Sequence, residues 1–357
     1  MKPTLREIAV RARVHHSTAS TILNGARGST RVSEATRHRV IDAARELGYS
    51  VNRAAQQLKK QRSGVVGLLV GGLENPFFAR LAALCTEALE REGYEVVLAA
   101  RRADESSDLH LLEALISRQL DGILLWNETL TELHDRVGQS DMNRSVVLGL
   151  PIDGRDSVSG DLEQGVREAL DHLYAQGRRR IAFLCPRVSI DRAGDPRYSV
   201  YVQRIRDWGL NSDVLAYDAP SYGFAAPRQS VQARFEQDSP PDALFCMNDN
   251  SAIAALMALG RSSVKVPDDV AIVGCDDLPL AAEMNVPLSS IAYPLKEMAT
   301  SAVRLLLDRI AAEEQGRPPA QPCHVLLPTR LVVRESSMPV HRAAQALHGT
   351  REGVTLR

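Results

Sequence analysis

Four polar side chains near the start of the chain have the types and spacing needed to read DNA. His16, Ser17, Thr18 and Thr21 can share the outer face of one short helix. Imidazole and hydroxyl groups on such a face can hydrogen-bond base edges or phosphate oxygens in a DNA groove. The alternative is a helical hairpin whose polar face is only solvated, so the elements that position these residues decide between the two interpretations.

Two short amphipathic helices around a tight turn are predicted to position them. Apolar residues recur at i, i+3, i+4 and i+7 in residues 5–12, and the same spacing returns in residues 19–23 after a turn near Arg13. Thr4 and Glu7 form a capping box, which fixes the start of the first helix. This pattern is typical of a helix-turn-helix.

A third helix and a local excess of basic residues support DNA binding. Ser33 is expected to cap this helix and Gly48 to end it. Residues 1–62 hold 13 Lys and Arg against 4 Asp and Glu, whereas residues 63–357 hold 30 against 40. A basic head on an acidic body suits a head that contacts phosphates. Four side chains are expected to close the three-helix core: Thr36, Val40, Ala44 and Leu47.

The body alternates apolar runs with helical patterns. Strands apolar on both faces that alternate with helices form parallel sheets covered on both sides. So many strands exceed one ordinary domain, and an α/β fold with two doubly wound lobes is expected. Strands are predicted at 65–70, 95–100, 122–126, 145–150, 181–185, 242–247 and 270–274, and helices at 77–91, 107–119, 162–176, 196–207, 249–259 and 295–313.

Residues suited to ligand binding lie at or just after the ends of three of these strands. This is the edge where doubly wound sheets bind small molecules. They are Trp126 with Asn127, Asp249, and Asp276. Carboxylates suit the hydroxyls of a sugar, and an aromatic face suits its apolar side. The alternative for Asp249 is a helix cap. The pair Asp276 and Asp277 is interpreted as a ligand contact rather than as an acid/base pair.

Enzyme, metal and membrane signatures are missing from the sequence. No G-x-G-x-x-G follows the first strand, and neither a phosphate-binding G-x-x-x-x-G-K-[ST] nor a G-x-S-x-G elbow occurs. The five cysteines lie far apart, and adjacent His15 and His16 would point about 100° apart on a helix, so no metal site is expected. Without a secretory signal or a membrane span, we expect a cytoplasmic protein with no enzyme activity, no cofactor and no membrane partner.

Several segments resemble the lactose/galactose repressor family of bacterial transcription regulators. They are TLREIAVRA, STASTILNG, RVSEATRHRVIDAARELGY, NRAAQQLKK and VGLLVGGLENPFFARL, and the resemblance runs from residue 4 to about 337. It implies a helix-turn-helix head at 1–50, a hinge helix and linker at 51–62, and a two-lobed effector-binding and dimerisation domain, similar to periplasmic sugar-binding proteins, at 63–337. It also implies that the chain crosses between the lobes near 160, 292 and 322. Residues 338–357 lack a sustained heptad, so we expect a disordered tail and a homodimer.

The resemblance also implies roles for individual residues. At the hinge, Leu58 matches a leucine that wedges into the minor groove. Some positions depart from the family pattern: Arg13 replaces Gly or Asn in the turn, His15 replaces a Ser cap, and Gly149 replaces an Asp. The expected DNA-binding residues are Thr4, Arg6, His15, His16, Ser17, Thr18, Thr21, Asn24, Arg39, Arg53, Ala54, Leu58 and Lys59. The expected effector-binding residues are Asn75, Phe77, Phe78, Trp126, Asp161, Arg197, Phe245, Asp249 and Asp276, with a core position as the alternative for Phe77.

Taken together, these patterns predict a transcription regulator, and more specifically a repressor. It is expected to bind an inverted-repeat, double-stranded DNA operator as a homodimer and to respond to a small-molecule effector such as a sugar. The alternative is a small-molecule-binding protein of the periplasmic-receptor type without a DNA role. The basic head, in place of a secretory signal, favours the regulator.

Overall fold

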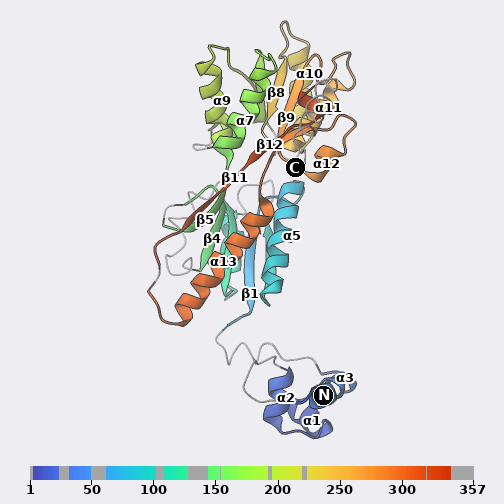
Figure 1. Cartoon of the computed structure of the whole chain (residues 1–357), viewed down its shortest axis with the longest axis vertical. Coiled ribbons are helices and arrows are strands. Elements are labelled where there is room, and N and C mark those ends of the chain that lie inside the picture. The colour runs from blue at the N-terminus through green and yellow to red at the C-terminus, as the bar shows by residue number, and fades with distance from the viewer. Residues whose placement is uncertain are drawn as a thin grey trace, which may run out of the picture. The chain divides into compact units, whose positions relative to one another are not determined.

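The chain folds into two compact units, Met1–Ser63 and Gly64–Arg357, which we describe separately (Figure 1). The computed structural model describes residues 3–23, 32–49, 62–101, 108–118, 120–127, 144–152, 154–191, 195–218, 223–318 and 320–338.

Three helices form the described part of the first unit, and both predicted N-caps are present. The Glu7 carboxylate accepts the Thr4 backbone N–H at 2.6 Å, and the Thr4 hydroxyl accepts the Glu7 N–H, which completes the capping box. The Ser33 hydroxyl accepts the Thr36 N–H in the same way. These bonds satisfy amides that have no partner inside their helices. The helices are α1 (Leu5–Arg11), α2 (His16–Leu23) and α3 (Glu34–Glu46).

The core of this unit differs from the prediction at one position. Ile8 and Val40 are fully buried at its centre, but Leu47 is 37% exposed. Leu47 is the C-cap residue of α3, where the chain turns away through Gly48 with φ +63°. Tyr49, beyond that turn, packs against the core instead. A left-handed glycine after the cap commonly ends a helix in this way, so the core contact shifts past it.

Two six-stranded sheets form the second unit, and the expected α/β class is confirmed. All seven predicted strands are present: β1 (Val65–Val70), β2 (Glu95–Ala100), β3 (Gly122–Asn127), β4 (Ser145–Gly149), β6 (Ile181–Pro186), β8 (Ala243–Cys246) and β9 (Ala271–Asp276). Five further strands complete the sheets: β5 (Asp156–Asp161), β7 (Asp213–Tyr217), β10 (Ser289–Ala292), β11 (His324–Pro328) and β12 (Arg330–Val332). The first sheet has the order β11-β5-β4-β3-β1-β2 and the second β12-β10-β9-β8-β6-β7. Only the β10–β12 pair is antiparallel among these described strands.

Helices cover both faces of each sheet. In the first lobe, α5 and α13 cover one face of the sheet and α6 packs against the other. In the second lobe, α7 and α9 lie opposite α10 and α11. The predicted helices are α5 (Pro76–Arg91), α6 (Asp108–Ile116), α7 (Leu162–Ala175), α9 (Pro196–Asp207), α11 (Asp249–Leu259) and α13 (Leu295–Glu314). The remaining helices among the described residues are α8 (Val188–Asp191), α10 (Ala225–Phe235), α12 (Pro279–Ala282) and the 3-10 helix η4 (Glu335–Ser337).

The chain crosses between the lobes three times, and one crossing lies later than expected. The first two follow β5 and β10, close to the expected residues 160 and 292. The third lies at Thr329 rather than near 322, because β11 still pairs with β5 as far as Pro328. Directly afterwards, β12 pairs with β10 of the second sheet. Beside the crossings, Tyr293 packs against the cores of both lobes.

The described helices include none that is both long enough and apolar enough to cross a membrane.

Candidate functional site

The expected DNA-reading residues lie together on α2. His16 and Ser17 are exposed in its first turn, and Thr18 and Thr21 are half-buried. The Thr21 hydroxyl donates to the Ser17 carbonyl at 2.9 Å, one turn earlier. His16 and Ser17 therefore present the most accessible polar groups of this helix.

His15 caps α2 with its imidazole ring. Its carbonyl accepts the N–H groups of Thr18 and Ala19, which places it at the N-cap. Its ring Nδ1 accepts the Ser17 backbone N–H at 3.3 Å and lies 2.8 Å from the Ser17 hydroxyl. The ring thus replaces the serine cap that the family pattern has here, and it also holds the Ser17 side chain.

Of the remaining expected DNA contacts, three lie among the described residues. Thr4 caps α1, and Arg6 is exposed at the start of that helix. The Arg39 guanidinium donates to the Ala12 carbonyl and to Thr36, each at 3.4 Å. The others lie outside the described residues: Asn24, Arg53, Ala54, Leu58 and Lys59.

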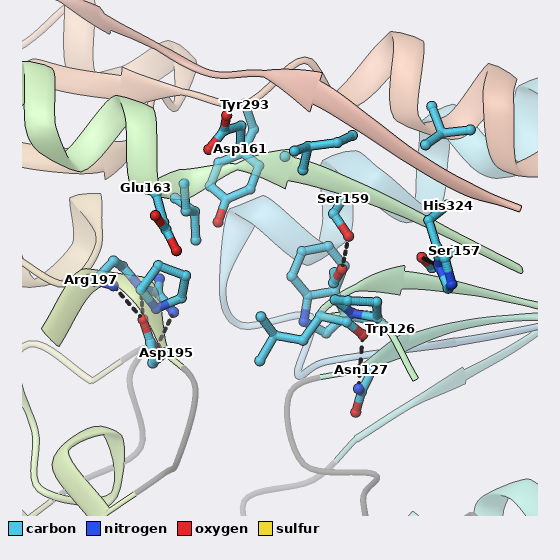
Figure 2. A pocket seen from close by; sticks show the side chains of 18 residues that line it. Trp126, Asn127, Ser157, Ser159, Asp161, Glu163, Asp195, Arg197, Tyr293 and His324 are labelled. Carbon is cyan, nitrogen blue, oxygen red and sulfur yellow. Dashed lines mark hydrogen bonds and ion pairs between the residues drawn. The ribbon is translucent and has the colours of Figure 1, made fainter. Parts of the chain in front are cut away.

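A cavity of about 530 Å³ lies in the second unit, between residues of both lobes (Figure 2). Trp126 lies near the end of β3 in the first lobe. Asp161 is the last residue of β5 and the N-cap of α7. Arg197 enters from the second lobe, in the first turn of α9. The structure therefore brings together three of the expected effector residues. The cavity lining is Trp126, Asn127, Gly149, Leu150, Pro151, Ser157, Ser159, Gly160, Asp161, Leu162, Glu163, Asp195, Pro196, Arg197, Tyr293, His324, Val325 and Leu326.

Arg197 forms a buried ion pair with Asp195. Its Nε and Nη2 donate to the two carboxylate oxygens at 3.0 and 2.8 Å, and Nη1 donates to the Met247 carbonyl at 3.2 Å. Burial alone would lower the pKa of Arg197, but the charge and hydrogen bonds of Asp195 raise it well above its ordinary value. Because these bonds occupy three of five N–H groups, two remain for a ligand. Asp195 also caps α9 by accepting the Arg197 N–H.

An aromatic cluster supports one wall of the cavity. The ring centroid of Phe77 lies 5.1 Å from that of Trp126 and 5.2 Å from that of Tyr293, and both contacts are edge to face. The ring centroid of Phe78 lies 5.6 Å from that of Trp126. Phe77 is only 3% exposed and belongs to the core of the first lobe, which is the alternative that we stated for it. The cluster fixes Trp126 and Tyr293, and those two rings face the cavity.

Gly149 makes room for the Trp126 ring. Its φ is +88°, and a Cβ there would lie 2.9 Å from the Asn127 carbonyl and 3.2 Å from the indole. This is a position where a side chain has no space and glycine has little conformational cost. In this chain the Asn127 carbonyl and the Trp126 indole therefore occupy the space that a side chain at residue 149 would need.

Asp249 lies away from the cavity lining. Its carboxylate is fully buried and accepts the Leu278 N–H at 2.8 Å and the Ser290 hydroxyl at 2.5 Å. Burial raises its pKa to about 6. The stated alternative, a cap of α11, is wrong, because Asn248 is the N-cap and accepts the Ser251 N–H. Asp249 therefore joins the turn after β9 to β10.

Four other expected effector residues also lie outside the cavity lining. Phe245 is fully buried and stacks on Phe183, with 5.2 Å between ring centroids. Asn75 caps α5, and Phe78 packs beside Phe77. Asp276 is buried at the end of β9 with φ +131°. The short apolar strands were predicted correctly, but the direction of each side chain at the strand ends was not available from their pattern.

Besides Tyr293, five polar residues of the lining were missed by the sequence analysis. Glu163 lies in the first turn of α7, and Ser159 on β5 donates to the Gly149 carbonyl. His324 Nδ1 lies 2.8 Å from the Ser157 hydroxyl, which joins β11 to β5. Asp195 precedes Pro196 and Arg197, and an Asp-Pro pair at a helix start is a capping signal that could have identified it.

Known proteins resemble both units. The family described as "Bacterial regulatory proteins, lacI family" matches residues 4–52, and the "Periplasmic binding protein-like domain" matches residues 170–337. The HTH-type transcriptional regulator CelR of Thermobifida fusca is 32% identical over 345 residues, which cover 94% of this chain and 98% of CelR. The HTH-type transcriptional repressor PurR of Aliivibrio salmonicida is 28% identical and covers 88% of this chain and 94% of its own.

Solved structures show the same architecture. A CelR–cellobiose complex is 31% identical with a TM-score of 0.64, and the match covers 94% of this chain and all of that one. The lac repressor dimer bound to operator and an anti-inducer shares the fold at 22% identity, with a TM-score of 0.77 over 95% of this chain and all of that one.

A helix-turn-helix unit followed by a two-lobed unit with a cavity defines a DNA-binding regulator of the ligand-responsive class. The chain belongs to the lacI family of bacterial regulatory proteins. It is a DNA-binding transcription regulator with a small-molecule effector.

Proposed function

We propose that this regulator is a repressor whose effector is a sugar bound in the cavity between the lobes. The observation that carries this proposal is the combination of two wall types in one cavity. Trp126 and Tyr293 offer aromatic surface for the apolar side of a sugar ring, and Arg197 with Asp195 offers donors and acceptors for its hydroxyl groups. The cellobiose bound by CelR supports a sugar of disaccharide size.

The DNA partner is an operator with an inverted repeat, bound by a homodimer. One eight-residue recognition helix reads too few base pairs for specificity, so two copies on a two-fold axis are needed. His16 and Ser17 would contact base edges, and Arg6, Arg39 and Arg53 would contact phosphates. The protein would act in the cytoplasm without catalysing a reaction.

The hinge helix expected at 52–59 would connect ligand binding to DNA binding. It is too short to be stable alone in water, so the dimer and the operator would have to hold it. Leu58 would then enter the minor groove, and movement of the lobes would shift the ordering of the helix. These residues lie outside the described part of the chain, so the proposal rests on the sequence and the family.

The test of the effector site is Arg197→Ala in the full chain. A panel of neutral sugars that includes cellobiose is first screened by thermal shift, because a bound ligand stabilises the folded state. Calorimetry with a sugar from that screen should then show an affinity loss of about 2 kcal/mol or more for the variant, since the sugar loses hydrogen bonds from a charged donor.

Operator binding without effector is the control for this variant. It should stay within about twofold of the wild type, because Arg197 lies in the second unit. An unchanged dissociation constant for the sugar would place the effector site elsewhere.

A further inference from the structure

The charged groups of the cavity lie mainly on one side of it (Figure 2). Among the lining residues that the structure describes, the carboxylates of Asp161, Glu163 and Asp195 accompany one guanidinium, that of Arg197. The opposite wall carries Trp126 together with uncharged amide and hydroxyl groups and the imidazole of His324. The net charge that a ligand meets therefore depends on which group pairs with the Arg197 guanidinium.

Asp195 neutralises Arg197 completely. Both carboxylate oxygens are bonded to the guanidinium, and the two side chains are only 4% and 11% exposed. A planar guanidinium that is already bound in this two-pronged way cannot offer the same edge to a ligand carboxylate or phosphate. Its two remaining N–H groups can still donate to neutral hydroxyls.

The other two carboxylates leave the cavity negative. Asp161 accepts the Gln164 N–H at 3.2 Å, a bond that leaves its charge in place. Arg167 Nη2 lies 3.5 Å from Glu163 Oε2. Both side chains are exposed, so solvent screens this ion pair. Even if Glu163 is counted as neutralised by Arg167, the described part of the lining holds no second Lys or Arg to balance Asp161.

We propose that Asp195 makes this cavity selective for uncharged sugars and against sugars that carry a phosphate or carboxylate. The proposal rests on the function proposed above, that the cavity holds a sugar effector. An anionic ligand would meet the negative charge of Asp161 and a guanidinium whose charge is already paired with Asp195, whereas a neutral diol can bond to both members of the intact pair. Asp195 is thus a specificity-determining residue as well as the cap of α9.

The decisive variant is Asp195→Asn. Asparagine is as good an N-cap as aspartate, so α9 should keep its start, and the variant removes one negative charge while releasing the guanidinium. Calorimetry on the full chain compares matched probes: glucose with glucose 6-phosphate and glucuronate, and cellobiose with cellobionate. We expect the wild type to bind each neutral probe at least about tenfold more tightly than its anionic partner, and Asp195→Asn to gain about tenfold or more for the anions.

Asp218→Asn is the matched control. Asp218 forms an exposed pair with Arg187 in the same lobe, with 2.9 Å between Arg187 Nε and Asp218 Oδ1, and neither residue lines the cavity. It should keep the wild-type preference. Circular dichroism of Asp195→Asn verifies that the helix content is unchanged.

Two outcomes overturn the proposal: a wild type that binds an anionic probe as tightly as its neutral partner, or an Asp195→Asn variant that gains no affinity for anions. A different result separates the two proposals. If the wild type binds no probe, neutral or anionic, and Asp195→Asn gains anion binding, then Asp195 excludes anions from the cavity and only the sugar effector fails.

Discussion

Burial and partners separate carboxylates that the sequence pattern treats alike. Asp161 lies at a strand end and faces the cavity, whereas Asp249, also just after a strand, is fully buried. A Cβ at Gly274 would clash with the Asp249 carboxylate, because the backbone of β9 packs directly against that carboxylate. Asp249 therefore acts within the fold of the second lobe, as a hydrogen-bond acceptor for Leu278 and Ser290.

The raised pKa of Asp249 predicts a specific dependence of stability on pH. Burial raises this pKa from 3.8 to about 6, so between these values the folded state keeps a proton that the unfolded state loses. The contribution of Asp249 is therefore fully present below pH 3.8 and is lost as pH rises through 6. A shift of this size corresponds to at most about 3 kcal/mol.

The variant Asp249→Asn isolates this effect. Its amide oxygen can still accept the Leu278 N–H, and no charge has to be buried. Urea unfolding of wild type and variant between pH 4 and pH 7.5 should show the wild type losing stability relative to the variant as pH rises. Parallel curves would contradict the assignment of the raised pKa to this residue.

At the scale of elements, the sequence predicted the strands that are apolar on both faces and missed the others. Residues 65–70 and 181–185 form apolar runs and were correctly predicted as strands. In contrast, β5 reads DSVSGD, and β10 has only four residues, so neither has a distinctive pattern. These strands are specified by pairing with distant strands, which no local pattern contains.

As with the strands, only part of the candidate site could be predicted from the sequence. The end of a strand identified Trp126, and the family resemblance identified Arg197. Asp195 and Tyr293 depend on which side chains the two lobes bring to a common space, and Glu163 depends on the face of α7 that turns towards it. Such placement is a tertiary property, and the capping signal at Asp195 is its only trace in the local sequence pattern.

The imidazole cap of α2 makes the start of this helix depend on His15. Replacement by alanine removes the acceptor for the Ser17 N–H, and loss of an N-cap costs about 1 kcal/mol. We expect the amides of residues 18–23 in His15→Ala to exchange about fivefold faster in the full chain, as measured by hydrogen exchange and NMR.

His15→Ser is the matched variant, because serine restores a cap of the ordinary kind. Its exchange rates should return to within about twofold of the wild type. Equal acceleration in both variants would show that the ring contributes through packing rather than as a cap.

At the scale of the whole molecule, specificity for DNA requires two copies of the first unit. We expect sequences selected from random DNA to be inverted repeats, each bound by two chains. Removal of one half-site should lower the affinity by a factor of about 10³, towards nonspecific binding. Fluorescence anisotropy at one fixed salt concentration measures this, and a half-site that binds as tightly as the full repeat would exclude the dimer model.

The three crossings between the lobes have a consequence for synthesis on the ribosome. The first sheet needs β11, and its covering helix α13 comes after β6 to β10 of the second sheet. Translation therefore completes the helix-turn-helix unit long before either lobe can close. A premature stop codon before Leu295 would yield a product with an intact DNA-reading face and no closed ligand module. Such a product would also lack a folded second unit to hold two copies of the first unit together, so operator specificity would be lost together with ligand control.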